Sequence, residues 1–411
     1  MDRVVITGMG TINSIGSGVK ETWANVIAGV SGVGPITVFD PSNLQVRIAC
    51  EVKNFDPASH MDAKEARRRD RYEQLATVAA NEALRDSGLE VTEANAQRIG
   101  IIVSSAIGGL HSIQEAVETV TREGPRRVSP FLIPMLMANG AAGLIAIDHG
   151  IKGTCLSVAS ACASGADSIG LAMTMIRSNV LDVVIAGASE STVTSVGVAA
   201  FDRVGAMSRR NEDYSMTPAP FDKNRDGLVM GEGAAVFVME REAHARQRGA
   251  HIYAELAGYG STADAFHVTA PHENGEGGTA AIKLALQTAG ANPEDVGYIN
   301  AHGTATQLND LSETKAIRGA FGPLTSRIPV SSTKSMTGHM MGATGALEVL
   351  FCVQALREGI LPPTIHYQTP DPECDLDVIP NKAREAKIKL AISNAVGFGG
   401  HNAVLAIRKY T

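Results

Sequence analysis

The sequence predicts an α/β protein built from two related halves, and three observations support this prediction. Short apolar runs typical of strands alternate with alanine-rich stretches typical of helices along all 411 residues. Glycine occurs 42 times while aromatic residues make up 4%, which indicates a core of small aliphatic side chains with close backbone contacts. The second half then repeats the order of the first. Two such halves are expected to pack intimately around one shared core.

Five apolar runs in the first half predict strands, with helices between them such as one over residues 63–87. The runs are residues 3–7, 98–103, 154–159, 182–187 and 234–239. Their counterparts in the second half begin at residues 252, 296, 327, 390 and 402. In each half the third strand leads into a tract of small residues and then a helix, so the duplication should bring the two tracts together. A charged stretch near residue 250 marks the expected boundary, which gives halves of 1–250 and 251–411.

Composition and charge narrow the function classes. The net charge of −7 argues against nucleic acid as a general partner, because neutralising phosphates requires a dominant basic face. No apolar run reaches the roughly 18 residues needed to cross a membrane, and the first residues read as a strand, not as an export signal. We therefore expect a cytoplasmic protein. Five scattered cysteines are expected to be free thiols: Cys50, Cys155, Cys162, Cys352 and Cys374.

Cys162 is the candidate nucleophile. It precedes the helical pattern ASGADSIGLAMTMI, so its sulfur should lie at a helix N-terminus. Unpaired N–H groups there stabilise anions and can lower the pKa of a thiol to about 3.5–7.5. The alternative is a small buried thiol that fills space, which describes most cysteines. The flanking Ala, Ser and Gly favour the nucleophile, because they let a backbone turn closely against a substrate.

Two histidines occupy matching contexts in the second half. His302 follows the predicted strand GYIN, and His339 follows the tract KSMTG before another helix rich in Gly and Ala. Neither has the spacing of a metal pair such as HExxH. A single histidine of this kind could equally be a helix cap or a satisfied core residue. Two of them at strand ends, beside Cys162, favour a catalytic site.

Lys334 and Phe398 complete the candidate site. The tract SSTKSMTG is too small and apolar for a solvated face, so a buried and paired lysine is expected, with Glu313 as the candidate partner. By the alternative reading, Glu313 is simply an acid on a helix surface. Phe398 lies among glycines at a strand end, where peptide N–H groups could bind a developing oxyanion, each worth roughly 3 kcal/mol. A plain hairpin turn is the alternative there.

Taken together, these motifs resemble those of the elongating, type II β-ketoacyl-[acyl-carrier-protein] synthases of fatty acid synthesis. SACASG, NAHGT, SSTKSMTGH, FDKNRDG with GEGAA, GPRRVSPF and GFGGHN occur in the family's order and span almost the whole chain. The resemblance implies a thiolase-like, duplicated αβαβα fold of five layers and a homodimer. It also implies decarboxylative Claisen condensation of an acyl thioester with malonyl-acyl carrier protein, which lengthens the acyl chain by two carbons.

Residue roles carried over from the resemblance fit elementary chemistry. Cys162 would hold the acyl group as a thioester, while His302 and His339 would promote decarboxylation and stabilise the enolate with two N–H donors. Lys334 would tune and orient the histidines. The backbone N–H groups of Cys162 and Phe398 would form the oxyanion hole, with Phe398 also gating acyl access. The expected substrate contacts are Thr304 and Thr306 on the phosphopantetheine arm, Leu228 and Glu313.

The resemblance also implies which partners and which cofactors the protein uses. Basic residues would dock an acidic acyl carrier protein, although the run KEARRRDR could be merely a solvated helix face. The docking candidates are Lys64, Arg67, Arg68, Arg126 and Arg127. No redox or catalytic metal cofactor is needed. A structural monovalent cation is expected at the family's positions, which here are Asn300, Glu348, Ser393 and Asn394.

Three departures from the family pattern keep a second function open. Leu228 stands where relatives have Phe and would loosen the gate around Phe398, Ala219 replaces an Arg, and Gly205 replaces a basic residue. The alternative is a ketosynthase subunit of a type II polyketide or other specialised pathway, which would pair with a chain-length partner. A coenzyme A thiolase is disfavoured by the second His tract. A Cys-His hydrolase would need an orienting Asn or Asp and no buried lysine.

Overall fold

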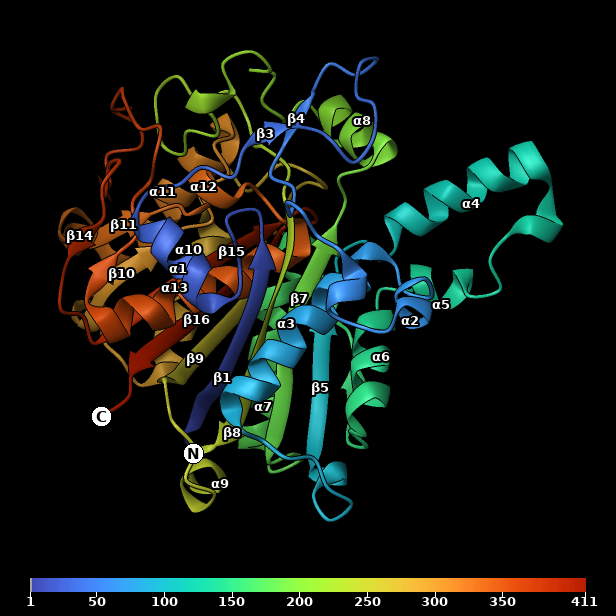
Figure 1. Cartoon of the computed structure of the whole chain (residues 1–411). Coiled ribbons are helices and arrows are strands. Elements are labelled where there is room, and N and C mark those ends of the chain that lie inside the picture. Colours follow the sequence, from blue (N-terminus) through green and yellow to red (C-terminus); the bar gives the residue numbers. More distant parts are fainter. Residues whose placement is uncertain (1) are drawn as a thin grey trace.

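The computed structural model describes residues 2–411 and contains the same strand order twice (Figure 1). The first half supplies β1 (Val4–Asn13), β5 (Ile99–Ser104), β6 (Cys155–Leu156), β7 (Val183–Ser191) and β8 (Glu232–Arg241). The second supplies β9 (Ala254–Ala263), β10 (Val296–Asn300), β11 (Pro329–Ser331), β15 (Leu390–Gly397) and β16 (His401–Lys409). Their orders are β1-β8-β7-β5-β6 and β9-β16-β15-β10-β11. Each half therefore arranges its first, fifth, fourth, second and third strands side by side.

Helices cover these strands in five layers, which confirms the predicted αβαβα fold. On the outer face of the first half lie α3 (Arg71–Ser87) and α6 (Gly140–His149). On that of the second lie α10 (Glu276–Ala289) and α11 (Gln307–Phe321). Between them, α7 (Ser164–Arg177) and α13 (Thr344–Glu358) contact strands of both halves. Because α13 is covered on all sides, its residues 344–356 are all buried.

The two halves share one core and one continuous sheet. β1 and β9 pair antiparallel, with Val4 opposite Leu256. The core around α7 and α13 draws side chains from both halves, among them Ile169, Phe237 and Phe351. Within residues 2–411, no helix is both long enough and apolar enough to cross a membrane.

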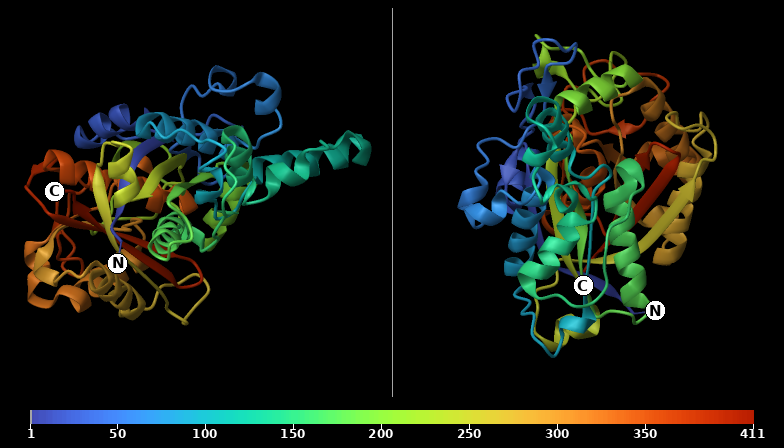
Figure 2. Two further views of the ribbon diagram at one scale, coloured as in Figure 1. Left: turned by 90° about the horizontal axis from the view of Figure 1, so that it is seen from below. Right: turned by 90° about the vertical axis from the view of Figure 1, so that its right-hand side faces the viewer.

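The remaining elements are short or lie outside the layers. The further strands are β2 (Gly16–Ser17), β3 (Gly34–Pro35), β4 (Ile48–Ala49), β12 (Ile360–Leu361), β13 (Asp377–Val378) and β14 (Arg384–Glu385). The further α-helices are α1 (Val19–Ile27), α2 (Ala63–Ala66), α4 (Leu110–Glu123), α5 (Leu132–Leu136), α8 (Ser195–Val204), α9 (Glu242–Gln247) and α12 (Lys334–Thr337). Of these, α4 projects as an arm from the side of the molecule (Figures 1 and 2).

Two sequence predictions about elements were wrong. The single helix over 63–87 is two helices, because Asp70 accepts a hydrogen bond from the N–H of Tyr72 and Glu73 accepts one from the N–H of Asp70, so that α3 starts afresh. The strand over 154–159 shrinks to β6. The chain leaves the sheet at Ser157 and turns toward the helix that follows Cys162.

Candidate active site

Two equivalent sharp turns pack against each other at the site, and one of them contains Cys162. Cys162 lies in the short 3-10 turn η4 (Ala161–Ala163), and the turn η8 (Met341–Ala343) occupies the equivalent position before α13. Each contains one non-glycine residue with a left-handed backbone, Ala161 at φ 51° and Met341 at φ 43°. A Cβ added to Gly165 of α7 would lie 2.7 Å from the carbonyl oxygen of Gly342. The small residues of the two tracts thus allow the turns to pack against each other.

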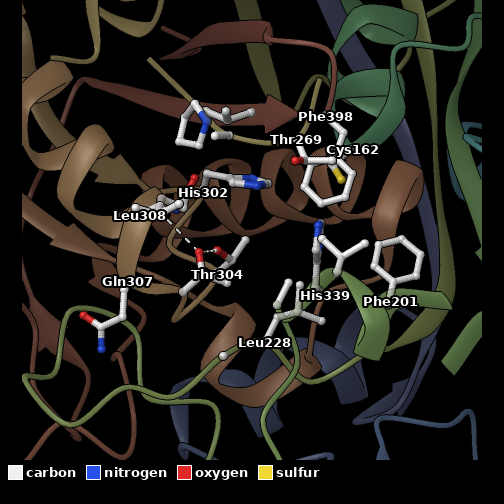
Figure 3. A pocket seen from close by; sticks show the side chains of 18 of the residues that line it. Cys162, Phe201, Leu228, Thr269, His302, Thr304, Gln307, Leu308, His339 and Phe398 are labelled. Atoms are coloured by element: carbon white, nitrogen blue, oxygen red, sulfur yellow. Dashed lines mark hydrogen bonds between the residues drawn. The ribbon is translucent and has the colours of Figure 1, made fainter. Parts of the chain in front are cut away.

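Cys162, His302, His339 and Phe398 line one cavity of about 270 Å³ (Figure 3). They come from η4, from the loop after β10, from the segment between α12 and η8, and from the turn between β15 and β16. The two imidazole rings meet edge to face, with centroids 5.3 Å apart and planes at 88°. The structure therefore brings together the four residues that the sequence places at separate strand ends.

Backbone contacts hold both histidines in place. The N–H groups of His302 and Gly303 donate to the carboxylate of Glu313 at 2.8 and 2.7 Å. The N–H of His339 donates to the carbonyl of Val229 at 2.7 Å, and its carbonyl accepts from the N–H of Gly231 at 2.8 Å. Each ring is thus presented by a fixed main chain.

Burial keeps both imidazoles uncharged. Desolvation lowers the pKa of His302 and of His339 well below the usual value, and the nearby positive charge of Lys334 lowers both further. The Nδ1 atom of His339 lies 3.1 Å from the hydroxyl of Thr344. If that hydroxyl donates, the proton of His339 sits on Nε2, the tautomer that can donate into the cavity. Thr344 was missed by the sequence reasoning, although it follows His339 by five residues in the same tract.

Lys334 is buried and paired as expected, but the predicted partner was wrong. Its Nζ lies 2.5 Å from Oε1 of Glu348 on α13, and both side chains are 1% exposed. Glu313 instead accepts from two backbone N–H groups and from the amide of Asn394 at 3.1 Å. Burial raises the pKa of Glu348 to about 8, and Lys334 opposes this rise. The chain separation of 14 residues between Lys334 and Glu348 gave no local signal of the pair.

The prediction of a low pKa for the Cys162 thiol was also wrong. Burial raises this pKa to about 11, while Lys334 and the N–H groups of Phe398 and of Cys162 itself lower it. Desolvation of the sulfur outweighs the favourable helix end, as it does for thiols in apolar surroundings. The thiol of Cys162 is therefore uncharged at rest. Its proton must be taken up when the sulfur reacts, and the neutral imidazoles are bases that line the same cavity.

Phe398 lies in a hairpin turn, and the same turn faces Cys162. It lies in the hairpin turn between β15 and β16, and its N–H also reaches the sulfur of Cys162. A Cβ added to Gly397 would lie 2.8 Å from the carbonyl of Ser160, so this turn packs directly on the Cys162 turn. The ring of Phe398 stacks on Phe201 of α8, with centroids 6.2 Å apart. Phe201, which the sequence reasoning missed, supplies an aromatic neighbour for this ring.

The expected substrate contacts occupy different parts of the site. Thr304 and Thr306 line the cavity with their hydroxyl oxygens 3.0 Å apart, and Leu228 lines it with 5% exposure. Gly205 lines it as well. Glu313 lies behind His302 and is not among the lining residues, because its carboxylate is turned toward the backbone.

The five docking candidates do not line the cavity of the same chain. Lys64, Arg67 and Arg68 lie on or beside α2, where Arg68 pairs with Glu65 at 2.9 Å. The other two, Arg126 and Arg127, follow the arm helix α4. Part of the KEARRRDR run is not solvated: Arg69 is 5% exposed and Arg71 pairs with the buried Glu232. The structure thus separates the basic residues into two groups.

Three of the residues at the expected cation site have buried oxygens without a hydrogen-bond partner. They are Oδ1 of Asn300, Oε2 of Glu348 and Oδ1 of Asn394. Asn300 and Ser393 are register partners on the paired strands β10 and β15. Hard cations are bound by such amide, carboxylate and hydroxyl oxygens. Residues 2–411 contain no cluster of three or more His, Cys, Asp or Glu side chains that could hold a metal ion.

Comparison with known proteins gives matches over nearly the full length. Residues 1–245 match the N-terminal domain of β-ketoacyl synthases, and residues 253–368 match the C-terminal domain. The chain is 48% identical to 3-oxoacyl-[acyl-carrier-protein] synthase 2 of Staphylococcus aureus (strain COL), over 99% of this chain and 98% of that protein. The corresponding protein of Coxiella burnetii is 46% identical with the same two coverages.

Solved structures with the same fold include enzymes of two kinds. A β-ketoacyl synthase from Burkholderia phymatum superposes with a TM-score of 0.93 at 35% identity. The ishigamide ketosynthase/chain length factor superposes with a TM-score of 0.92 at 37% identity. A type II polyketide ketosynthase in complex with its acyl-carrier protein superposes with a TM-score of 0.92 at 34% identity. All three alignments cover the whole of both chains.

Proposed function

Because the chain belongs to the β-ketoacyl synthase family, we propose that it extends fatty acyl chains by decarboxylative condensation with malonyl-acyl carrier protein. It is a condensing enzyme of the acyltransferase class. The observation that carries the proposal is the meeting of Cys162 with two uncharged imidazoles in one cavity. This set offers one nucleophile for the acyl group and two N–H donors for the malonyl group in the same cavity.

The first half-reaction moves the acyl group onto the enzyme. The sulfur of Cys162 attacks the acyl thioester of the carrier, so that a new S–C bond forms and the bond to the pantetheine sulfur breaks. A neutral imidazole takes the thiol proton and returns it to the departing thiolate. The N–H groups of Cys162 and Phe398 hold the oxyanion that forms between these steps.

The second half-reaction makes the carbon–carbon bond. Malonyl carrier protein loses CO₂, and the electron pair of the broken C–C bond becomes an enolate whose oxygen is held by N–H donors of His302 and His339. Donors of this kind are worth roughly 3 kcal/mol each when they are fixed in a dry site. The enolate carbon then attacks the Cys162 thioester, and the S–C bond breaks. The released thiolate takes up one proton from water to restore the thiol, so each condensation consumes one proton.

The test separates the nucleophile from the decarboxylating groups. Glutamine at position 162 resembles an acylated cysteine in shape and carries no nucleophile, so we expect Cys162→Gln to release CO₂ from malonyl carrier protein without condensing it. Release of CO₂ and formation of β-ketoacyl product are measured in parallel. Adding His302→Ala to this variant should stop CO₂ release. Absence of CO₂ release from Cys162→Gln itself would contradict the independent role given to the histidines.

A polyketide-type ketosynthase is the second candidate, favoured by Leu228, Ala219, Gly205 and the solved polyketide ketosynthases. Both functions use the same catalytic residues and differ in the acyl group that they accept. Leu228 lines the same cavity as the stacked rings of Phe398 and Phe201, so its size can affect which acyl groups fit there.

We expect Leu228→Phe to narrow the range of acyl chains that the enzyme accepts. The larger ring would fill part of the cavity of about 270 Å³ that residue 228 and Phe398 both line. Competition among acyl carrier proteins of different chain length measures the effect, as the ratio of kcat/KM values. Identical ratios in the variant and the native enzyme would remove Leu228 from the selectivity determinants.

The proposed partners are an acyl carrier protein and a second copy of this chain. Exposed apolar residues on and near the arm support the second copy, together with the open edge of β6. They are Ile113, Val117, Val120, Ile133 and Met137. In the polyketide alternative, a chain-length partner would take the place of the second copy. Sedimentation equilibrium of the chain, alone and with a candidate chain-length partner, distinguishes a homodimer from a heterodimer. A stable monomer in both samples would contradict both proposals.

The carrier protein would dock on the basic residues. Docking by Lys64, Arg67 and Arg68 should weaken with added salt. A KM for the carrier protein that does not change with salt would exclude this surface.

We propose no redox or catalytic metal cofactor, and one structural monovalent cation held by Asn300, Glu348, Ser393 and Asn394. The three unpartnered buried oxygens support this site. Replacement of sodium and potassium by choline should lower the melting temperature of the protein, and an unchanged melting temperature would count against the cation site.

A cytoplasmic location is proposed from the five free cysteines. Nucleic acid is not proposed as a partner.

A further inference from the structure

Glu190, the next-to-last residue of β7, is a buried acid: desolvation raises its pKa to about 7, and hydrogen-bond donors oppose this rise. Its side chain is 0% exposed. Its oxygens accept from the hydroxyl of Ser105 at 2.6 Å, the N–H of Ala106 at 2.8 Å and the N–H of Gly342 at 3.1 Å. A carboxylate with this many donors is fixed in position, and it fixes the donors in return.

The donors belong to segments that are distant in the sequence. Ser105 and Ala106 form the turn after β5 in the first half, whereas Gly342 lies in η8 of the second half. A Cβ added to Gly342 would lie 2.8 Å from the Glu190 carboxylate and 2.7 Å from the N–H nitrogen of Ala106. The carbonyl of Gly342 packs on Gly165 of α7. Gly342 therefore fills the space between the carboxylate and the helix that begins after Cys162.

Both reacting groups are affected by this contact. Along the chain, Gly342 lies between His339 and Thr344, whose hydroxyl contacts the His339 ring. Above its own pKa of about 7, the ionised Glu190 raises the pKa of the Cys162 thiol, while Lys334 lowers it. The titratable side chains that line the same cavity as the sulfur are the uncharged rings of His302 and His339 and the carboxyl group of Asp226.

We infer that Glu190 is a positioning residue that fastens the turn after His339 to the helix of Cys162 and acts electrostatically on the sulfur. Glutamine at this position keeps the size of the side chain but loses the charge, and its NH₂ group would face an N–H donor. The turn would then lose one of its fixed contacts. The inference rests on the proposed function for its rate measurement only, because alkylation of the thiol requires no substrate.

The test uses Glu190→Gln with two measurements. Alkylation of Cys162 by iodoacetamide, followed by mass spectrometry of its peptide, should have a midpoint at lower pH than the native value of about 11, because a negative charge near the sulfur is gone. Decarboxylation of malonyl carrier protein should fall about tenfold, because the His339 turn is less well held. A structural role without the electrostatic contact would not shift the alkylation midpoint.

Ser105→Ala is the matched control, since it removes one neutral donor and keeps the charge. We expect its alkylation midpoint to equal that of the native enzyme and its decarboxylation rate to fall by a smaller factor. An unchanged midpoint in Glu190→Gln would overturn the inference. If Glu190→Gln does not fold, the decarboxylation rate of Ser105→Ala tests the inference instead. A rate in Ser105→Ala equal to that of the native enzyme would overturn the inference. If the native enzyme itself releases no CO₂ from malonyl carrier protein, the result contradicts the proposed function and not this inference.

Discussion

Replacing Cys162 with alanine is expected to abolish condensation while leaving the fold intact. The sulfur of Cys162, the proposed nucleophile, lines the cavity beside both imidazoles, so its loss should remove the acyl-enzyme step (Figure 3). Removal of a catalytic nucleophile commonly lowers the rate by on the order of 10⁴-fold or more. The thiol is uncharged at rest, because burial raises its pKa to about 11, and no ion pair is broken by the change. Stability should therefore change by only about 1 kcal/mol.

Mass spectrometry after incubation with an acyl carrier protein measures the result directly. The native chain should gain the mass of one acyl group on the Cys162 peptide, and Cys162→Ala should gain none. Cys155 offers the matched control, since it is an exposed thiol outside the cavity. Cys155→Ala should retain both acylation and condensation. Acyl transfer that persists in Cys162→Ala would show that another group is the nucleophile.

Local features of the sequence predicted the parts of the fold that depend on local conformation. Tracts of Gly, Ala and Ser around Cys162 and His339 predicted sharp turns, and these turns contain left-handed residues in both halves. Alternating strands and helices predicted the duplicated order, which the sheet confirms. The break before α3 could also have been found, because Asp70 and Glu73 have the spacing of a capping box.

Properties that depend on tertiary packing could not be predicted in the same way. The pKa of Cys162 is set by how much water its surroundings exclude, and the helix pattern carries no information about that. The choice between Glu313 and Glu348 as partner of Lys334 depends on how α13 packs behind α12. Phe201 reaches Phe398 from an element almost 200 residues earlier, so no spacing rule could reveal the contact.

Replacing Lys334 with methionine is the second change with a large expected effect, and it acts on stability as well as on activity. Lys334 and Glu348 are each 1% exposed, with Nζ and Oε1 2.5 Å apart. At a pH above the pKa of Glu348, which is about 8 in the native chain, removing Lys334 leaves an uncompensated buried charge and costs about 3–5 kcal/mol of unfolding free energy. The positive charge that lowers the pKa of Cys162, His302 and His339 is lost as well. We therefore expect both the unfolding free energy and condensation to fall.

The loss of stability should depend on pH in a defined direction. Burial already raises the pKa of Glu348 to about 8, and removal of Lys334 takes away the charge that opposes this rise. Between the unfolded pKa of about 4.5 and the raised native pKa, the native state binds more protons than the unfolded state, so the free energy of unfolding falls as pH rises. In the variant this fall continues above pH 8. Urea unfolding should therefore show a larger difference from the native enzyme at pH 9 than at pH 6.

A double variant separates the stability effect from the catalytic one. Lys334→Met combined with Glu348→Gln removes the stranded carboxylate, so the extra loss at pH 9 should disappear and most of the stability should return. Condensation should remain low, because the lysine charge beside the imidazoles and the thiol is still missing. Recovery of activity together with stability would mean that Lys334 acts only through folding. A single variant as stable as the native enzyme at pH 9 would contradict the buried pair itself.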